Sequence, residues 1–134
     1  MPYLAGVVLA LAVSGLATLV GLDRGRGFYP TVLVVIASYY VLFAVMGGSG
    51  HALVMETLVM VGFLVVAVIG FKRNLWLVVA ALAGHGVFDF FHARVVANPG
   101  VPAWWPGFCL TFDITAAAYL TWLLGRSRLG TATP

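Results

Sequence analysis

Carboxyl groups inside apolar stretches are the residues of this sequence that point most directly to chemistry. Of the four acidic residues, only Asp23 stands in a polar loop, whereas Glu56, Asp89 and Asp113 each fall within a long apolar stretch. An ionisable side chain at the depth of a bilayer costs about 2.5–3.5 kcal/mol on insertion scales, and such groups face a bundle interior and pair there. We therefore expect these three carboxyl groups to meet partners inside the fold.

Two histidines share the apolar stretch of Asp89 at helical spacing. His85, Asp89 and His92 stand at positions i, i+4 and i+7, so in an α-helix they lie on one face. Two imidazoles and a carboxylate on one helix face are typical of metal ligands in helical zinc and di-iron sites. A histidine and a carboxylate one turn apart can also simply neutralise each other, and this alternative stays open.

Neighbouring helices can complete a metal site around this face. We predict four ligands for a divalent metal ion: His85, Asp89, His92 and Asp113. Glu56 is expected to act as the general base or as a further ligand. A mixture of imidazole and carboxylate donors favours Zn²⁺, with iron or manganese as alternatives, over Mg²⁺ or Ca²⁺.

Five further residues are candidate accessory groups near this site. His51 stands at the start of the third apolar stretch, where a solvated loop residue is the simpler interpretation. Cys109 comes one helical turn before the acid of the fifth stretch, and a small buried apolar group is the simpler interpretation there. Tyr39 could donate to the site or only pack, and the same holds for its neighbour Tyr40. Trp104 and Trp105 belong to a loop rich in proline and glycine, which is either a cap over the site or an interfacial anchor.

Five apolar stretches must position these side chains. A helix needs about 20 apolar residues to cross a bilayer, and five stretches qualify: residues 3–21, 31–46, 52–71, 75–96 and 108–125. No linker separates them, so residues 1–134 are predicted to form one all-α domain, an integral membrane bundle of five transmembrane helices. Small residues recur at every fourth position of the first stretch and predict close helix packing: Gly6, Ala10, Ser14 and Thr18.

The composition excludes several classes of protein. Of the 134 residues, 63% are hydrophobic and 8% are charged, against about 45–50% and 25% in soluble domains. A water-soluble fold of this size cannot bury so much apolar surface, and a disordered chain needs the opposite composition. Seven scattered basic residues and a net charge of +3 do not support binding to nucleic acid. The single cysteine excludes an intrachain disulfide and a cysteine-rich zinc module.

The positions of the basic residues predict the orientation of the bundle. Six of the seven fall in the first loop, the third loop and the C-terminal tail: Arg24, Arg26, Lys72, Arg73, Arg126 and Arg128. With five spans these places share one side of the membrane, and only Arg94 lies on the other. The positive-inside rule then places the N-terminus outside and the C-terminus in the cytoplasm. The histidines and the intramembrane acids fall at similar depth, in the outer leaflet of a cytoplasmic membrane.

One pattern in the fourth stretch and the loop after it is shared with other proteins. Residues 84–92 are followed by Asn98-Pro99, Trp105-Pro106, Cys109 and Asp113. This pattern covers about a quarter of the chain and resembles a set of small bacterial multi-pass membrane proteins of uncharacterised function, so it implies an inner-membrane location and no particular reaction. In its chemistry the predicted site is also similar to intramembrane zinc amidases of the alkaline ceramidase and adiponectin-receptor class. Those proteins have seven spans and differently spaced His and Asp residues, so no residue role carries over.

These observations lead to three hypotheses about function. The first is a metal-dependent membrane enzyme, hydrolytic or oxidative, that acts on a lipid or another amphipathic substrate at the outer leaflet. The second is a proton- or ion-coupled transport subunit, because intramembrane Asp, Glu and His also form relays. The third is a redox subunit that binds haem or quinone, with His85 or His92 as the axial ligand of a haem. The lipid bilayer is the expected partner in each case, and a homo-oligomer could complete a transport path.

Overall fold

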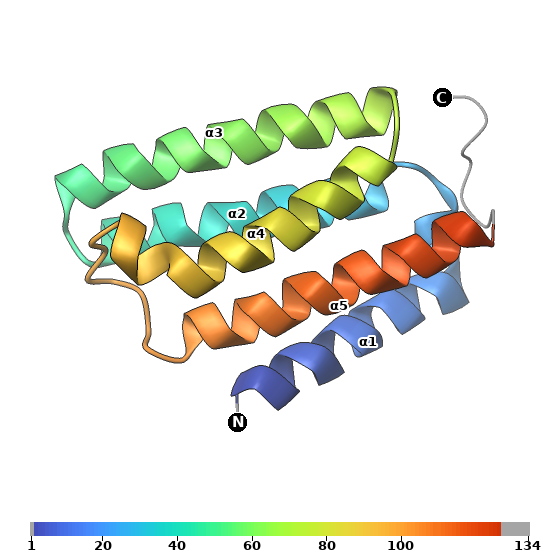
Figure 1. The fold of residues 1–134 in the computed structure, drawn as a ribbon, viewed down its shortest axis with the longest axis horizontal. Coiled ribbons are helices and arrows are strands. Elements are labelled where there is room, and N and C mark those ends of the chain that lie inside the picture. Colours follow the sequence, from blue (N-terminus) through green and yellow to red (C-terminus); the bar gives the residue numbers. More distant parts are fainter. Residues whose placement is uncertain (1, 127–134) are drawn as a thin grey trace.

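The structure, a computed structural model, describes residues 2–126 and consists of five long helices joined by short connections (Figure 1). The helices are α1 (Pro2–Val20), α2 (Phe28–Met46), α3 (Gly50–Lys72), α4 (Trp76–Val95) and α5 (Trp105–Gly125), and the short 3-10 helix η1 (Leu22–Arg24) follows α1. Residues 2–126 contain no β-strand. The predicted all-α class and the count of five helices are confirmed.

All five helices are long and apolar enough to cross a membrane. Large apolar side chains on their outer faces stay exposed, as contact with lipid requires; Leu19, for example, is 85% exposed and Leu58 is 63% exposed. The fold is therefore that of a multi-pass membrane protein. The orientation of the termini stays a prediction, and Arg128, one of the basic residues on which it depends, lies outside the described residues.

Two helices begin three residues before the predicted starts. Helix α2 begins at Phe28 instead of residue 31, and α5 begins at Trp105 instead of residue 108. Each contains a proline in its first turn, Pro30 in α2 and Pro106 in α5. Proline is tolerated there because the first backbone N–H groups of a helix have no partner within the helix. Trp105, predicted to belong to a loop, is thus a helical residue.

Helix α4 lies in the middle of the bundle. It packs against α5 on one side and against α2 and α3 on the other, while α1 packs along the far side of α5 (Figure 1). Because helices surround α4 in this way, its face with His85, Asp89 and His92 is buried. Three neighbouring helices can therefore offer side chains to this one face.

The small residues of α1 form its contact with α5. Gly6, Ala10 and Ser14 are all buried, and a Cβ added at Gly6 would lie 2.3 Å from the main-chain oxygen of Phe108. At the other end of α1, the hydroxyl groups of Thr18 and Tyr119 lie 2.8 Å apart. The small-residue pattern is thus confirmed as a packing face.

The loop between α4 and α5 folds back onto the end of α2. A Cβ added at Gly100 would lie 1.8 Å from the main-chain oxygen of Phe43, so only glycine fits at this crossing. The Asn98 side chain accepts a hydrogen bond from the Gly100 N–H at 3.1 Å, and its amide nitrogen donates to the main-chain oxygen of Tyr40 at 3.1 Å. This loop therefore closes one end of the bundle over the polar residues described next.

Candidate metal centre

Five ionisable side chains form a buried polar layer near one end of the bundle. Each is at most 2% exposed. They come from three helices and are Glu56 of α3, His85, Asp89 and His92 of α4, and Asp113 of α5. The contacts below link them, so the three acids meet partners inside the fold, as predicted.

One imidazole and two carboxylates make up the first part of this layer. His85 Nδ1 lies 2.6 Å from Asp113 Oδ2 and 3.4 Å from Asp89 Oδ2. One ligand atom from each residue lies within 4.8 Å of the others, as metal binding requires. We call these three residues the His85 cluster. Gly86 allows α5 to approach this closely, because a Cβ at that position would lie 3.3 Å from the Cβ of Asp113.

A second pair of side chains lies beside the His85 cluster. His92 Nε2 lies 2.6 Å from Glu56 Oε2, and we call these two residues the Glu56–His92 pair. The same Glu56 oxygen accepts a hydrogen bond from the amide nitrogen of Asn98 at 2.8 Å. The loop after α4 thus contributes directly to the site.

Tyr40 of α2 connects the two parts of the layer. Its hydroxyl group donates a hydrogen bond to Asp89 Oδ1 at 2.6 Å. Its ring is stacked on the His92 ring, with centroids 3.9 Å apart and an angle of 11° between the planes. The edge-to-face contact of Phe63 with His85, at 4.7 Å, covers the cluster from α3. Aromatic rings therefore fix both imidazoles.

The structure divides the four predicted ligands. It brings together His85, Asp89 and Asp113, whereas His92 pairs with Glu56 and lies outside this group. The physical reason is the helix that each histidine meets. His85 contacts Asp113 of α5, whereas His92, about 10 Å further along α4, contacts Glu56 of α3. His92 is thus already paired with a carboxylate outside the His85 cluster.

The predicted accessory residues lie in three different places. His51 is in the first turn of α3 and is exposed, and Trp104 is 53% exposed. Tyr39, Trp105 and Cys109 line a cavity between α1, α2 and α5. Cys109 is buried, as expected for a small buried apolar group. None of these five has a described hydrogen bond or ion pair to the polar layer.

Asn98 was not predicted as part of the site, and Tyr40 was predicted only as a possible donor beside Tyr39. Tyr40, and not the neighbouring Tyr39, donates to Asp89. The buried positions of α2 include 33, 36, 37, 40, 43 and 44, a helical spacing that places residue 40 on the core face and could have identified it. Asn98 had a weaker signal, an amide side chain directly after the end of a span. Its role depends on how the loop folds back.

Three buried carboxylate oxygens have no hydrogen-bond partner among the described residues. They are Glu56 Oε1, Asp89 Oδ2 and Asp113 Oδ1. A buried oxygen of this kind costs about 1–3 kcal/mol, and more when it is charged. Two of the three belong to the His85 cluster, so this cluster can still accept a proton or a cation.

The donor set of the His85 cluster defines its chemistry. One imidazole nitrogen and carboxylate oxygens suit Zn²⁺, iron or manganese, and three protein ligands leave positions open for water or substrate, as in catalytic zinc sites. No protein-family model, curated protein or solved structure matches the chain. The structure thus presents a buried group that could hold a metal ion in a protein with five membrane-spanning helices.

Proposed function

We propose that this protein is a membrane-embedded metalloprotein that binds one divalent ion, Zn²⁺ first among the candidates, on His85, Asp89 and Asp113. The observation that carries the proposal is that one imidazole and two carboxylates meet in the His85 cluster, where Asp89 Oδ2 and Asp113 Oδ1 accept no hydrogen bond from the described residues. Two carboxylates buried around one imidazole need compensation of their negative charge, by protons or by a cation. A divalent cation bound by all three side chains would supply it.

The balance of charge in the whole layer supports this assignment. With a neutral His85, the two carboxylates of the cluster carry a charge of −2, which one divalent ion cancels. The Glu56–His92 pair is neutral as an ion pair, since His92 Nε2 and Glu56 Oε2 lie 2.6 Å apart. Without the metal ion, the cluster becomes neutral only by taking up protons, because a net negative charge at this depth is costly in an apolar interior.

The proposed activity is that of a metal-dependent enzyme acting on a lipid or another amphipathic substrate at the outer leaflet. A bound ion with open positions would activate water and polarise a carbonyl or phosphoryl oxygen. Glu56 is the proposed general base, because its Oε1 has no partner and His92 orients the carboxylate through Oε2. The orientation proposed for the bundle places this layer toward the outside.

A proton relay is the second candidate function. Short contacts run from Asp113 through His85 and Asp89 to the Tyr40 hydroxyl group. Such a chain of titratable groups is typical of intramembrane proton paths. The contact between Tyr40 and His92 is a ring stack and not a hydrogen bond, so the described chain ends before it reaches Glu56.

Elemental analysis together with a visible absorption spectrum of the purified protein tests the proposal. We expect about one zinc, iron or manganese ion per chain and no haem band. His85→Ala is expected to remove the ion, whereas His51→Ala, at an exposed position of α3, is expected to retain it. His92→Gln is also expected to retain it, which separates the His85 cluster from the four-ligand set.

Two results would contradict this proposal. One is wild-type protein that contains no metal after growth and purification with added zinc, iron and manganese. The other is a His85→Ala variant with the metal content of the wild type. A haem band in the spectrum would support the redox hypothesis instead.

A further inference from the structure

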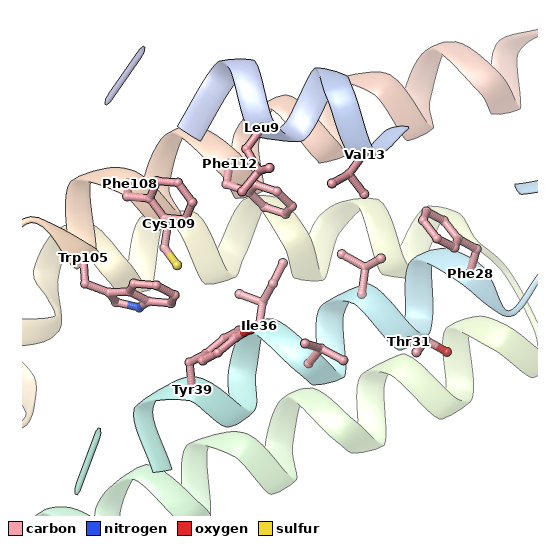
Figure 2. A pocket seen from close by; sticks show the side chains of 12 residues that line it. Leu9, Val13, Phe28, Thr31, Ile36, Tyr39, Trp105, Phe108, Cys109 and Phe112 are labelled. Carbon is pink, nitrogen blue, oxygen red and sulfur yellow. The ribbon is translucent and has the colours of Figure 1, made fainter. Parts of the chain in front are cut away.

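A long apolar cavity runs between α1, α2 and α5 (Figure 2). Its volume is about 410 Å³, within the range of about 300–1,000 Å³ typical of small-molecule sites. The side chains that line it are almost all apolar. Those in its middle include Leu9 and Val13 of α1, Ile36 of α2 and Phe112 of α5.

The shape and the opening of the cavity suit one alkyl chain. Phe28 and Tyr39 lie toward its two ends (Figure 2), and their separation of eleven positions corresponds to about 16 Å along α2. Leu9 and Val35 line the cavity and yet are 43% and 47% exposed. Since these helix faces are in the membrane-spanning part of the fold, the cavity opens sideways toward lipid.

One end of the cavity carries a hydrogen-bond donor without an acceptor. Trp105 is 9% exposed, and its Nε1 is buried with no hydrogen-bond partner among the described residues. Its indole ring lies at the cavity wall next to Tyr39, with ring centroids 5.0 Å apart (Figure 2). A buried indole N–H usually finds an acceptor. A ligand oxygen at this end would provide it.

The same end of the cavity adjoins the metal centre. The sulfur of Cys109 points into the cavity (Figure 2), and Cys109 precedes Asp113 by one turn on α5. A polar group held beside Trp105 therefore lies at the end of the cavity that Cys109 separates from the His85 cluster, while an attached chain extends toward Phe28.

We infer that this cavity binds a lipid with a single acyl chain, whose ester carbonyl oxygen accepts a hydrogen bond from Trp105 Nε1. The chain fills the space between α1 and α2, and the ester end is presented toward the metal centre. As a statement about the substrate class, this inference rests on the proposed function. As a statement about binding, it stands on the cavity and on the unpartnered indole.

Binding of tritiated 1-monopalmitoylglycerol to the purified full chain tests this inference. The protein is held in a steroid-based detergent, which has no alkyl chain to compete, and binding is measured by scintillation proximity. We expect saturable binding of one molecule per chain. Val13→Trp, which fills the cavity from α1, is expected to abolish binding. Leu16→Trp, an equal change at a position of α1 that is 59% exposed, is expected to retain it.

The hydrogen bond is tested with Trp105→Phe. Loss of one hydrogen bond is expected to weaken binding of monopalmitoylglycerol about fivefold. Hexadecane, which has no oxygen, is expected to compete equally well in the wild type and in this variant. Absence of saturable binding, or equal binding by Val13→Trp and Leu16→Trp, would overturn the inference. An unchanged affinity in Trp105→Phe would overturn the assignment of the carbonyl partner.

Metal content is measured on the same samples. Lipid binding without bound metal would overturn the proposed function and leave the lipid site standing. Bound metal without lipid binding would overturn the lipid site alone.

Discussion

Replacing Asp113 with Asn perturbs the proposed metal centre with little change of shape. Asp113 Oδ2 lies 2.6 Å from His85 Nδ1, and the side chain supplies one of the two carboxylates of the cluster. Asn has nearly the same size and lacks the charge. In a metal site the change weakens ion binding, whereas in a metal-free apolar bundle Asn resembles a protonated acid and costs little.

The expected magnitude follows from the linkage between binding and folding. An ion present at 100 times its Kd stabilises the folded state by about 2.7 kcal/mol. Loss of a group around a metal typically weakens binding about 10- to 100-fold, even for residues that only orient a ligand. With a 100-fold loss, the same ion concentration stabilises the Asp113→Asn variant by only about 0.4 kcal/mol. Chelation should therefore destabilise the wild type by about 2 kcal/mol more than the variant.

The assay is denaturation of both proteins, each with and without a chelator, at one fixed concentration of metal. Glu56→Gln is the matched control, because it also removes a buried carboxylate but from the Glu56–His92 pair. It should retain the wild-type response to the chelator. If the chelator lowers the stability of the wild type and of Asp113→Asn by the same amount, Asp113 is not a ligand and the reasoning fails.

Three further predictions concern the surroundings of the site. Tyr40→Phe removes the hydrogen bond to Asp89 and retains the ring, so the free energy of unfolding should fall by about 1.5–3 kcal/mol; no change would mean that this bond is not formed. Gly6→Ala places a methyl group against the backbone of α5 and should cost about 1–3 kcal/mol in thermal or chemical denaturation. Gly15→Ala, which meets no atom within 4 Å, should leave stability unchanged or raise it, and equal effects would refute the packing argument. A fluorescent reporter that folds only in the cytoplasm, fused to the C-terminus, should fluoresce; an active periplasmic reporter there would reverse the orientation.

Much of the fold could be predicted from the sequence because lipid imposes simple rules. A spanning segment must be apolar and long enough, so the five helices followed from hydropathy alone. The polar layer followed as well, since Glu56, Asp89 and Asp113 interrupt apolar segments at similar depth. These predictions needed no knowledge of how the helices are rotated about their axes.

The details of the site depend on that rotation. Adjacent residues of a helix point about 100° apart, and this separates Tyr40, which donates to Asp89, from Tyr39, which lines the cavity. The order of helices around α4 decided that His92 meets Glu56 while His85 meets Asp113. A single sequence contains no direct signal for which helices are neighbours, so one continuous ligand set was predicted where the structure has two separate groups.

The packing of α1 against α5 has a consequence for how the protein is made. These are the first and the last of the five helices to leave the ribosome, and α1 packs chiefly on α5. Until α5 is inserted, the small-residue face of α1 has no helix to pack against, and the His85 cluster lacks Asp113. Final assembly therefore waits until α5 is inserted in the bilayer, and a nascent chain stalled before α5 would expose the buried acids of α3 and α4 to membrane quality-control proteases.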